Sequence, residues 1–492
     1  MTSTLNTLAL DLGAESGRAI LGQFDGQRLA LTDIHRFANG PVRLPDGLHW
    51  DVLRLWTEIK TGLSKAARQL NQPLAGIGID TWGVDFALLD RQDALIGNPH
   101  HYRDDRTDGM LEAVLRRVPR EEIFAQTGIQ FMQLNTLYQL YAMVAQQAPA
   151  LSIAETFLTI PDLFNFWLTG VKACEFSHAT TTQCYDPRRQ DWAWPLLQAL
   201  DIPTHIFPQV LPAGTVRGTL LPHIAEETGA QDILVIAPAC HDTGSAVVAV
   251  PAERPGFAWI SSGTWSIMGV EAPEPIITPD SLRYNFTNEG GAGGSFRFSK
   301  NIMGLWLVQE CRRWWAGHGE ELSYAQLTQM AAAARPFTCL IDPDHSDFLK
   351  PGDMPARIQA YAARTGQTVP QTQGEIVRSA LEGIALKYRY VLEKAEEMLG
   401  QTLAPIHIVG GGTQNQLLSQ FTADATGRLA LTGPIEATAM GNCLLQAVAL
   451  GHLGSLWEAR AVVRASSEVL TFEPGDRSGW DDAYARFDQL MP

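Results

Sequence analysis

Two glycine-rich turns are the first features of the sequence that could carry chemistry. The first turn follows an apolar run that contains Asp11 and consists of Gly13, Ala14, Glu15, Ser16 and Gly17; the second contains Gly263 and Thr264. Backbone amides of such a turn can bind phosphate oxygens, while a carboxylate beside it holds a hydrated Mg²⁺. Either turn alone is also typical of an ordinary β-hairpin. Together, two opposed turns predict a clamp around a polyphosphate.

A third glycine turn offers a place for the flat part of a nucleotide. The apolar run Ile406–Val409 leads into Gly410, Gly411 and Gly412, and a helical apolar pattern follows. Three glycines let an adenine or a ribose approach the backbone, although a tight strand-to-helix turn explains the motif equally well. No Lys-Ser or Lys-Thr pair follows the glycines, so the motif is not a Walker loop, and it does not match the dinucleotide fingerprint.

Asp242 is the candidate for a general base. It follows the apolar run Ile233–Ala237 and precedes the small-residue helical segment Thr243–Val248. One interpretation is that Asp242 simply caps this helix. Phosphoryl transfer, however, needs a positioned carboxylate that orients the attacking hydroxyl and accepts its proton. The neighbouring His241 could contact a sugar hydroxyl or could be a hydrogen-bonded histidine of the core.

The segment Asp80–Phe86 supplies the parts of a sugar-binding site. It ends an apolar run and offers an aromatic side chain, a glycine and two carboxylates within seven residues. Sugar pockets are built from such parts, but Trp82 could equally be a residue of the core. The charged segment Tyr102–Arg106 could belong to the same site or form a solvated surface loop.

These residues need a framework of strands and helices to position them. The segments Leu8–Phe24 and Phe257–Val270 both read as β-hairpins, and they lie about half a chain apart. This repetition predicts duplicated domains that face one another. Ala75–Asp80 and Ile233–Ala237 read as buried strands, and Leu53–Leu70 has helical spacing. Alternating strands and helices predict an α/β fold.

The second half of the chain contains one long amphipathic helix. Apolar residues recur at helical spacing from Val377 to Ala395, and Gly400 stands where a C-terminal cap belongs. The patch Pro251–Gly256 is the most favourable domain boundary, because Pro and Gly separate two self-contained patterns there. We therefore expect one domain over residues 1–250 and another over residues 251–492.

Bulk composition excludes several classes of protein. A chain of 492 residues exceeds the size of a single core, so about two domains are expected. The net charge of -16 would repel nucleic acid. No stretch approaches the ~20 apolar residues that span a bilayer, and the N-terminal residues do not read as a signal peptide. A cytoplasmic enzyme that binds neither nucleic acid nor membrane is the expectation.

The cysteines do not suggest disulfides or a metal centre. They are widely spaced and form no C-x-x-C pair, which predicts reduced, buried thiols. A structural zinc site built on them is not expected. The six cysteines are Cys174, Cys184, Cys240, Cys311, Cys339 and Cys443.

Over nearly its whole length the sequence resembles the FGGY carbohydrate kinases. Asp11–Arg18, Ser261–Ser266 and Val409–Asn415 are typical of the wider family. Asp80–Phe86 and His241–Thr243 point to its members that act on L-rhamnulose. The stretches are Asp11–Arg18, Asp80–Phe86, Asn135–Leu140, His241–Thr243, Ser261–Ser266, Asn301–Trp306 and Val409–Asn415.

The resemblance implies a fold and a set of residue roles. The implied fold is two actin-like ATPase (ribonuclease H-like) domains that flank a deep catalytic cleft, with the sugar held mainly by the first and ATP mainly by the second. Asp242 would be the base that takes the proton of the sugar O1. Gly83, His241 and Thr243 would bind the sugar together with Asp242. The residues Gly13 to Gly17 and Thr264 would contact ATP phosphates, Asn301, Gln309 and Gly411 would complete the nucleotide site, and Asp11 would organise Mg²⁺.

The implied reaction is transfer of a phosphoryl group from ATP to O1 of L-rhamnulose. The alternative within the family is another ketose, such as L-fuculose or a pentulose. Two hypotheses of other classes are an ATPase of the same fold that acts as a chaperone or filament, and a non-catalytic sugar-binding module. A base carboxylate beside a sugar-like pocket favours the kinase. We expect a monomer or a small homo-oligomer.

Overall fold

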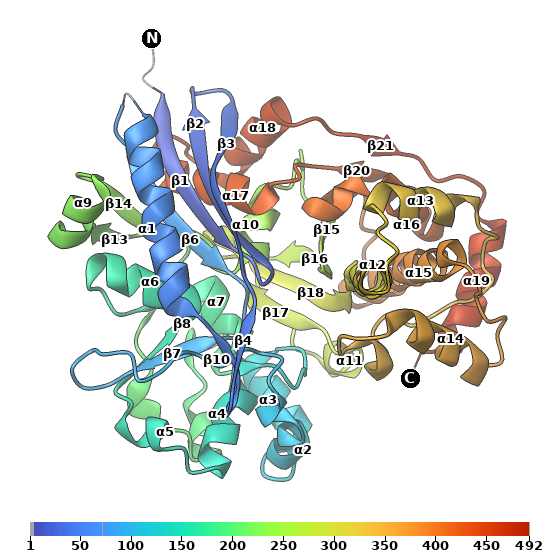
Figure 1. Ribbon diagram of the computed structural model, residues 1–492, viewed down its shortest axis with the longest axis horizontal. Helices are drawn as coiled ribbons and strands as arrows, with labels where there is room; N and C mark the ends of the chain where they lie inside the picture. Colours follow the sequence, from blue (N-terminus) through green and yellow to red (C-terminus); the bar gives the residue numbers. More distant parts are fainter. Residues whose placement is uncertain (1–3, 71, 492) are drawn as a thin grey trace. The chain divides into compact units, whose positions relative to one another are not determined.

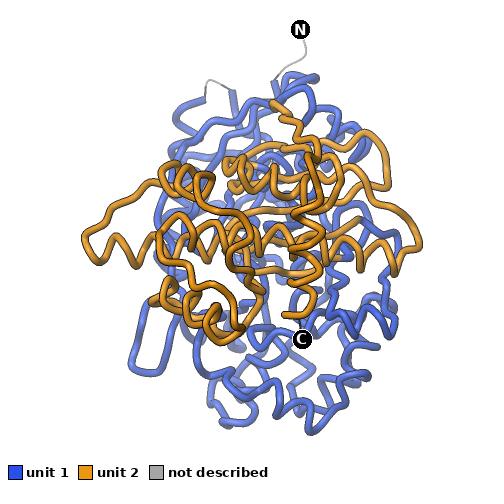
Figure 2. Tube along the Cα trace, turned by 90° about the vertical axis from the view of Figure 1, so that its right-hand side faces the viewer, with its two compact units in different colours: residues 1–249, 271–298, 437–466 blue, residues 250–270, 299–436, 467–492 orange. Residues whose placement is uncertain are grey.

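The computed structural model describes residues 4–70 and 72–491. The chain forms two compact units, each assembled from three segments (Figure 2). Unit 1 comprises residues 1–249, 271–298 and 437–466, and unit 2 comprises residues 250–270, 299–436 and 467–492. The predicted division at residue 250 falls where the first segment of unit 1 ends, but two later segments return to that unit.

Unit 1 is built on a six-stranded sheet. Its strands, in spatial order, are β13 (Thr215–Thr219), β14 (Leu234–Ala237), β6 (Gly76–Thr81), β1 (Leu5–Leu12), β2 (Ser16–Phe24) and β3 (Leu29–Ala38). β1 forms a hairpin with β2 and runs parallel to β6, which runs parallel to β14. The carboxyl ends of these parallel strands therefore meet at one edge, where ligands bind in open α/β sheets.

Helices cover both faces of this sheet. Leu8 and Leu10 of β1 pack into one core with side chains of α1 (Val52–Gln69) and α6 (Ile160–Thr169). Side chains alternate along a strand, so the intervening residues face the other side. There α17 (Ala437–Ala449) contacts β1 and β6, and α10 (Asp242–Val248) contacts α17 and β6. The predicted strands and the helix near residues 53–70 are thereby confirmed (Figure 1).

Smaller elements complete unit 1. The short strands are β4 (Pro41–Leu44), β5 (Gly47–Trp50), β7 (Phe86–Leu89), β8 (Thr156–Thr159), β9 (Cys174–Glu175), β10 (Tyr185–Asp186), β11 (Asp191–Trp192), β12 (Val210–Leu211) and β17 (Thr287–Gly290). The remaining helices are α2 (Met110–Leu115), α3 (Arg120–Thr127), α4 (Thr136–Ala145), α5 (Pro149–Ile153), α7 (Phe176–Thr181), α8 (Trp194–Ala199), α9 (Pro222–Thr228), α11 (Pro279–Arg283) and α18 (Leu456–Ser466).

Unit 2 contains the second hairpin and the triple-glycine turn. Its strands follow one another in the order β18 (Phe296–Met303), β16 (Trp265–Ala272), β15 (Ala258–Ser262), β19 (Ile406–Val409), β20 (Ala430–Thr432) and β21 (Thr471–Phe472). Its helices are α12 (Trp306–Gly317), α13 (Tyr324–Ala333), α14 (Met354–Arg364), α15 (Gln373–Leu399), α16 (Gln416–Thr426) and α19 (Ser478–Asp488).

The long helix α15 begins and ends where its sequence signals stand. Thr372 and Glu375 form a capping box at its N-terminus, and Gly400 ends it in the left-handed region at φ 65°. Its buried stripe includes Leu381, Ile384 and Tyr388, as the helical spacing predicted. α15 is therefore a core element, and Oη of Tyr388 donates a hydrogen bond to Oγ of Ser266 on β16.

The two sheets repeat one topology. In unit 1, β14, β6, β1, β2 and β3 lie side by side, and in unit 2 the corresponding strands are β20, β19, β15, β16 and β18. In each unit the hairpin's first strand runs parallel to the strand beside it, β6 or β19. The hairpins β1–β2 and β15–β16 thus occupy equivalent places, and the predicted duplication of the fold is confirmed.

Two predictions about composition can be compared with the structure directly. All six cysteines are buried and unpaired with one another, as expected. Within residues 4–70 and 72–491, none of the helices combines the length and the apolar character that crossing a membrane would require.

Candidate active site

Two aspartates lie side by side on the strands that form the centre of unit 1. Asp11 of β1 and Asp80 of β6 are register partners on neighbouring parallel strands, and both side chains are buried. Oδ2 of Asp11 accepts a hydrogen bond from Nε of Arg18 at 2.8 Å. Oδ2 of Asp80 accepts one from Nδ2 of Asn442 on α17. Oδ1 of Asp80 is buried and has no hydrogen-bond partner among the described residues.

Two neighbouring carboxylates affect the pKa of Asp80. Burial raises the pKa of Asp80 well above its usual range, the negative charge of Asp11 raises it further, and Asp242 also contributes. Arg18 is the cation that opposes this shift. Three carboxylates against one guanidinium leave excess negative charge at the carboxyl edge of the sheet. The carboxylate oxygens of Asp11, Asp80 and Asp242, among them the unpartnered Oδ1 of Asp80, fit a hard divalent cation such as Mg²⁺.

Asp242 is brought to this edge by the chain that connects β14 with α10. The residue before it, His241, forms a parallel β-bridge with Thr81 at the end of β6. Asp242 is the first residue of α10, and the N-cap position belongs to His241, so the interpretation of Asp242 as the N-cap residue is wrong. Its Oδ1 accepts hydrogen bonds from N of Thr243 at 2.6 Å and from Oγ1 of Thr243 at 3.2 Å.

The Asp242 carboxylate is both held and accessible. Its side chain is 32% exposed, whereas the side chain of Asp11 is only 2% exposed. A carboxylate that is fixed through one oxygen and open to solvent can accept a proton from a bound hydroxyl. Asp11 and Asp80 are buried and therefore less accessible to a substrate hydroxyl.

A buried charge cluster orients His241. Nη2 of Arg297 lies 3.0 Å from Nδ1 of His241 and 3.0 Å from Oε2 of Glu289, and that oxygen is 3.1 Å from the same Nδ1. The guanidinium can only donate to Nδ1 and the carboxylate can only accept from it, so Nδ1 finds a partner in either tautomer of the ring. Nε2 is 3.4 Å from Oδ1 of Asp242. His241 therefore places its Nε2 beside the exposed carboxylate.

Glu289 and Arg297 were not identified from the sequence. They lie on β17 and β18, about fifty residues beyond His241, and the side chain of Arg297 is completely buried. Their neighbourhood contains no motif that stands out by residue type or spacing. Only the return of residues 271–298 to unit 1 brings them to the site.

Gly83 lies against His241, and its neighbour adopts an unusual backbone conformation. A Cβ at Gly83 would stand 3.3 Å from Nε2 of His241 and 3.4 Å from Cγ2 of Thr181. Val84 has φ 69°, which is costly for a β-branched residue and is typical of functional sites. Its N–H donates to Oγ1 of Thr181, and its carbonyl accepts from Oγ1 of Thr136. Both threonines hold the chain in this conformation.

Asp85 has a structural role, which corrects its assignment to a sugar-binding surface. The carboxylate is buried and accepts hydrogen bonds from Nε1 of Trp50, Nε1 of Trp82 and Nε2 of Gln139, at 2.6, 2.9 and 2.8 Å. Burial raises its pKa to about 6. Trp82 is buried and packs on Trp50 with ring centroids 3.8 Å apart, so it is a core residue.

The segment Tyr102–Arg106 is not a freely solvated loop. The backbone N–H of Tyr102 donates to Oδ2 of Asp85 at 3.2 Å. Asp104 is buried, and its carboxylate accepts from the backbone N–H groups of Leu48 and Arg106. This segment therefore supports the core around Asp85.

The turn between β1 and β2 closes tightly on itself. N–H of Gly13 donates to the carbonyl of Ser16 at 2.9 Å, and Nδ2 of Asn39 donates to the carbonyl of Gly13 at 2.8 Å. A Cβ on Gly17 would overlap the ring of Phe37, which explains the glycine there. Glu15 and Ser16 are exposed and Ala14 is half-buried. The turn thus presents its tip outward from the same β1 that carries Asp11.

The equivalent turn in unit 2 is anchored to a helix. N–H of Gly263 donates to the carbonyl of Trp265 at 2.9 Å, and N–H of Trp306 donates to the carbonyl of Thr264 at 3.1 Å. Trp306 begins α12, whose first turn carries Gln309. Oε1 of Gln309 is buried without a hydrogen-bond partner among the described residues. A buried amide oxygen in this state can accept a hydrogen bond from a ligand or a water molecule.

The triple-glycine turn lies against the same hairpin. Gly410 has φ 90°, a conformation that favours glycine, and a Cβ on Gly412 would come within 2.7 Å of Cβ of Ser262. Gly411 is exposed, and a Cβ there would meet nothing within 4 Å. The half-buried Asn301 lies on β18, the strand beside β16. Unit 2 therefore gathers Thr264, Gly411 and its neighbours around one turn.

Family models match both halves of the chain. Residues 6–249 match the N-terminal domain, and residues 258–450 the C-terminal domain, of the FGGY family of carbohydrate kinases. The chain is 42% identical to a rhamnulokinase of Bacteroides thetaiotaomicron, over 98% of both chains. It is 41% identical to a rhamnulokinase of Oceanobacillus iheyensis, over 94% of this chain and 97% of the relative.

Solved structures share the fold at low sequence identity. A gluconate kinase from Lactobacillus acidophilus superposes with a TM-score of 0.81 at 15% identity, covering 99% of this chain and 98% of that one. A xylulose kinase from Rhodospirillum rubrum gives a TM-score of 0.80 at 19% identity, again over 99% and 98%. The predicted class, an α/β protein of two actin-like ATPase domains, is confirmed. The chain belongs to the FGGY family of carbohydrate kinases.

Proposed function

We propose that this enzyme transfers the terminal phosphoryl group of ATP to O1 of L-rhamnulose, giving L-rhamnulose 1-phosphate and ADP. The observation that carries the proposal is the accessible carboxylate of Asp242 beside the buried pair Asp11 and Asp80. The choice of sugar rests on relatives about 40% identical over nearly the full chain, which are rhamnulokinases. L-fuculose or a pentulose is less well supported for the same reason.

Asp242 is the proposed general base. One oxygen is held by Thr243, so the carboxylate has a fixed direction while its accessible side accepts the proton of the sugar hydroxyl. Loss of that proton makes the sugar oxygen a better nucleophile toward the terminal phosphorus. The displaced bridging oxygen stays with ADP, so the phosphoryl group moves from one oxygen to the other.

The sugar would be bound by the groups that surround this carboxylate. His241 offers Nε2 to a sugar oxygen, and Arg297 and Glu289 hold the ring in place through Nδ1. Gly83 leaves room beside the ring for the substrate. Thr243 both fixes Asp242 and offers its hydroxyl to the sugar.

Asp11 is the proposed residue for Mg²⁺, with the unpartnered oxygen of Asp80 beside it. The bound ion would neutralise charge on the phosphates during transfer. Arg18 holds Asp11 in place and offsets part of the negative charge of the three carboxylates. The protein thereby supplies an oxygen-only, acidic environment for the cation.

The nucleotide would be bound by both glycine turns. We assign the phosphates to Gly13–Gly17 and Thr264, and the remainder of ATP to Asn301, Gln309 and Gly411. The buried, unpartnered oxygen of Gln309 and the open space at Gly411 support this assignment. Residues 1–250 would hold mainly the sugar and residues 251–492 mainly ATP. A cytoplasmic location and a monomer or small homo-oligomer stay predictions from the sequence.

A coupled assay of ADP release over a panel of ketoses tests the substrate. L-rhamnulose should give the highest kcat/KM, with L-fuculose and D-xylulose well below it. Comparable turnover of another ketose would contradict the assignment of the sugar. ADP release that needs no sugar would instead favour a nucleotide-driven ATPase of the same fold.

A further inference from the structure

A cluster of metal-ligating side chains lies in unit 1, outside the site described above. Asp46 stands in the turn between β4 and β5, His49 lies on β5, and His100 lies in the segment that pairs with β5. His49 and His100 are bridge partners, and the hydrogen bonds Trp50 N–H to Pro99 O (2.8 Å) and His101 N–H to Leu48 O (2.9 Å) flank them. This backbone pairing places the two rings side by side, with centroids 4.1 Å apart.

The ligand atoms of the three side chains converge. One potential ligand atom from each of Asp46, His49 and His100 lies within 4.8 Å of the other two. Nδ1 of His49 is 3.0 Å from the carbonyl oxygen of Asn98, which can only accept, so Nδ1 carries a proton. In the neutral ring Nε2 then bears a lone pair, and it faces Oδ1 of Asp46 at 3.1 Å. Two acceptors at this distance require a cation or a proton between them.

His49 already has the support that metal-bound histidines use. A ligating imidazole usually donates its other N–H to a carbonyl or a carboxylate, which fixes its tautomer and its direction. The carbonyl of Asn98 plays this part for His49, whose ring is buried. The free nitrogen is therefore aimed at the exposed carboxylate of Asp46 before any metal binds.

His100 supplies the second imidazole of the cluster. Its Nδ1 is buried without a hydrogen-bond partner among the described residues, and Oδ1 of Asp104 lies 3.9 Å away. An imidazole nitrogen in this state is available as a metal ligand.

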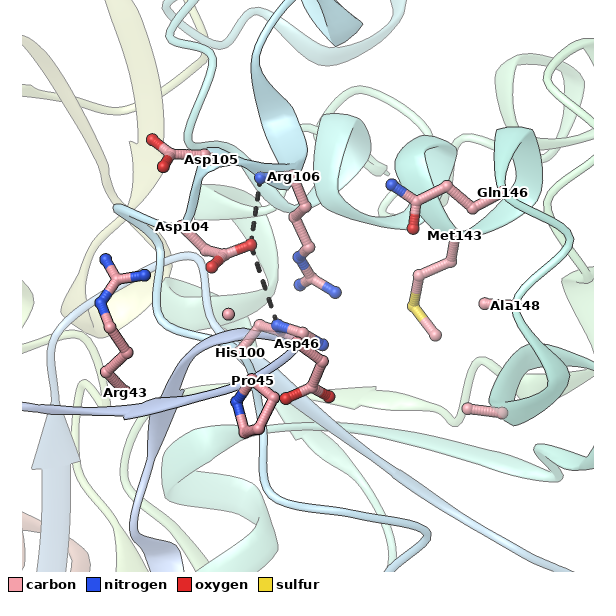
Figure 3. Close-up of a pocket in the computed structure, with 12 residues that line it drawn as sticks. Arg43, Pro45, Asp46, His100, Asp104, Asp105, Arg106, Met143, Gln146 and Ala148 are labelled. Atoms are coloured by element: carbon pink, nitrogen blue, oxygen red, sulfur yellow. Dashed lines mark hydrogen bonds and ion pairs between the residues drawn. The ribbon is translucent and has the colours of Figure 1, made fainter.

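A cavity of about 460 Å³ gives access to the cluster. Figure 3 shows Asp46, His100 and Asp104 on one side of it, away from Met143 and Ala148. Three carboxylates and two guanidinium groups line the cavity, so the lining carries excess negative charge. These charged residues are Arg43, Asp46, Asp104, Asp105 and Arg106.

We propose that Asp46, His49 and His100 form a binding site for one divalent transition-metal ion, best matched by Zn²⁺. Two imidazole nitrogens and one carboxylate are a common zinc ligand set, with a fourth position left for water. Nitrogen ligands do not suit Mg²⁺, which prefers oxygen, so the site is distinct in chemistry from that at Asp11.

The ion would tie the β4–β5 turn to the segment around His100. Asp104 already links these parts, because its Oδ2 accepts from N–H of Leu48 at 2.7 Å and its Oδ1 from N–H of Arg106 at 3.0 Å. The same segment supports the core around Asp85 through Tyr102. Metal binding should therefore rigidify the segment that supports the core around Asp85.

A zinc titration of the full-length, tag-free, metal-stripped enzyme tests the proposal. Competition with a chromophoric chelator, in excess Mg²⁺, should give one Zn²⁺ per chain. Asp46→Asn should weaken binding at least about tenfold by removing the charged ligand, and His100→Gln should do the same. Asp46 is largely exposed, so Asp46→Asn should fold normally.

Two control variants separate this site from its surroundings. Asp105→Asn removes a carboxylate from the same cavity without touching the three ligands, and it should bind Zn²⁺ like the wild type. Asp11→Asn should also keep Zn²⁺ binding, whatever its effect on phosphoryl transfer. No bound Zn²⁺, or equal affinity of the wild type and Asp46→Asn, would overturn the proposal and leave an Asp46–His49 ion pair.

Discussion

The turn of three glycines gives a matched pair of substitutions with opposite expected outcomes. In Gly412→Ala the added methyl would lie 2.7 Å from Cβ and 2.9 Å from the carbonyl oxygen of Ser262. Ordinary contacts begin at 3.4 Å, so the hairpin turn of β15–β16 would have to recede. The oxygen belongs to the backbone and cannot rotate away. In Gly411→Ala the methyl meets nothing within 4 Å.

The size of the effect follows from the cost of overpacking. Inserting a methyl into a closely packed position costs about 1–3 kcal/mol. For a unit of this size, a loss of 1 kcal/mol lowers Tm by about 2–4 °C, so Gly412→Ala should unfold about 2–12 °C below the wild type. Because the displaced turn carries Thr264, KM for ATP should also rise. Gly411→Ala should keep the wild-type Tm and change only KM for ATP.

Differential scanning calorimetry and initial-rate kinetics measure these two properties. The informative comparison is between the two variants, because the change in sequence is the same at adjacent residues. If Gly412→Ala has the wild-type Tm and the wild-type KM for ATP, the close packing of the glycine turn on Ser262 is refuted. If Gly411→Ala is the less stable variant, the open space assigned to Gly411 is wrong.

Three further substitutions test other parts of the structure. Burial raises the pKa of Glu175 to about 7, so the folded protein favours the protonated side chain. The free energy of unfolding should therefore fall as pH rises from about 5 through 7. In Glu175→Gln, chemical denaturation should show this pH-dependent fall reduced by up to about 3 kcal/mol. Gly441→Ala would place a methyl 2.7 Å from the carbonyl carbon of Ser245, forcing α17 from α10, and calorimetry should show a Tm several degrees lower. Glu289→Gln removes the carboxylate that lies 3.0 Å from the buried guanidinium of Arg297, which should cost about 3–5 kcal/mol and raise KM for the sugar while KM for ATP stays unchanged.

Elements with a strong pattern could be predicted from the sequence. The hairpins β1–β2 and β15–β16, the helix α15 and its cap at Gly400 all lie where apolar spacing and glycine placed them. These elements depend on local signals: alternation in strands, a 3.6-residue period in helices, and a glycine after the last turn. The repeated hairpin also predicted the repeated topology.

Residues that reach the site through tertiary structure could not be predicted. Glu289 and Arg297 act on His241 from a segment that returns to unit 1 after an excursion of the chain. Asn442 contacts Asp80 from α17, more than 350 residues away in sequence. No local pattern encodes such partners, because their role depends on which strands and helices become neighbours.

Asp85 shows how a motif can mislead. Its place in a short run with Trp82 and Gly83 suggested a sugar ligand, but three side-chain donors occupy the carboxylate inside the core. The type and the spacing of Asp85 are typical of a binding site, but its carboxylate is buried and therefore has a structural role. The adjacent Gly83 remains at the proposed site, because its backbone lies against His241.

The most direct test of the central claim is the phosphorylation rate of Asp242→Asn with L-rhamnulose, measured alongside ATP binding by calorimetry. Asparagine keeps the shape of the side chain and cannot accept the proton of the sugar hydroxyl, so kcat should fall by about 10²-fold or more. The Kd for ATP should stay at the wild-type value. Retention of most of the turnover would contradict the assignment of Asp242 as the base.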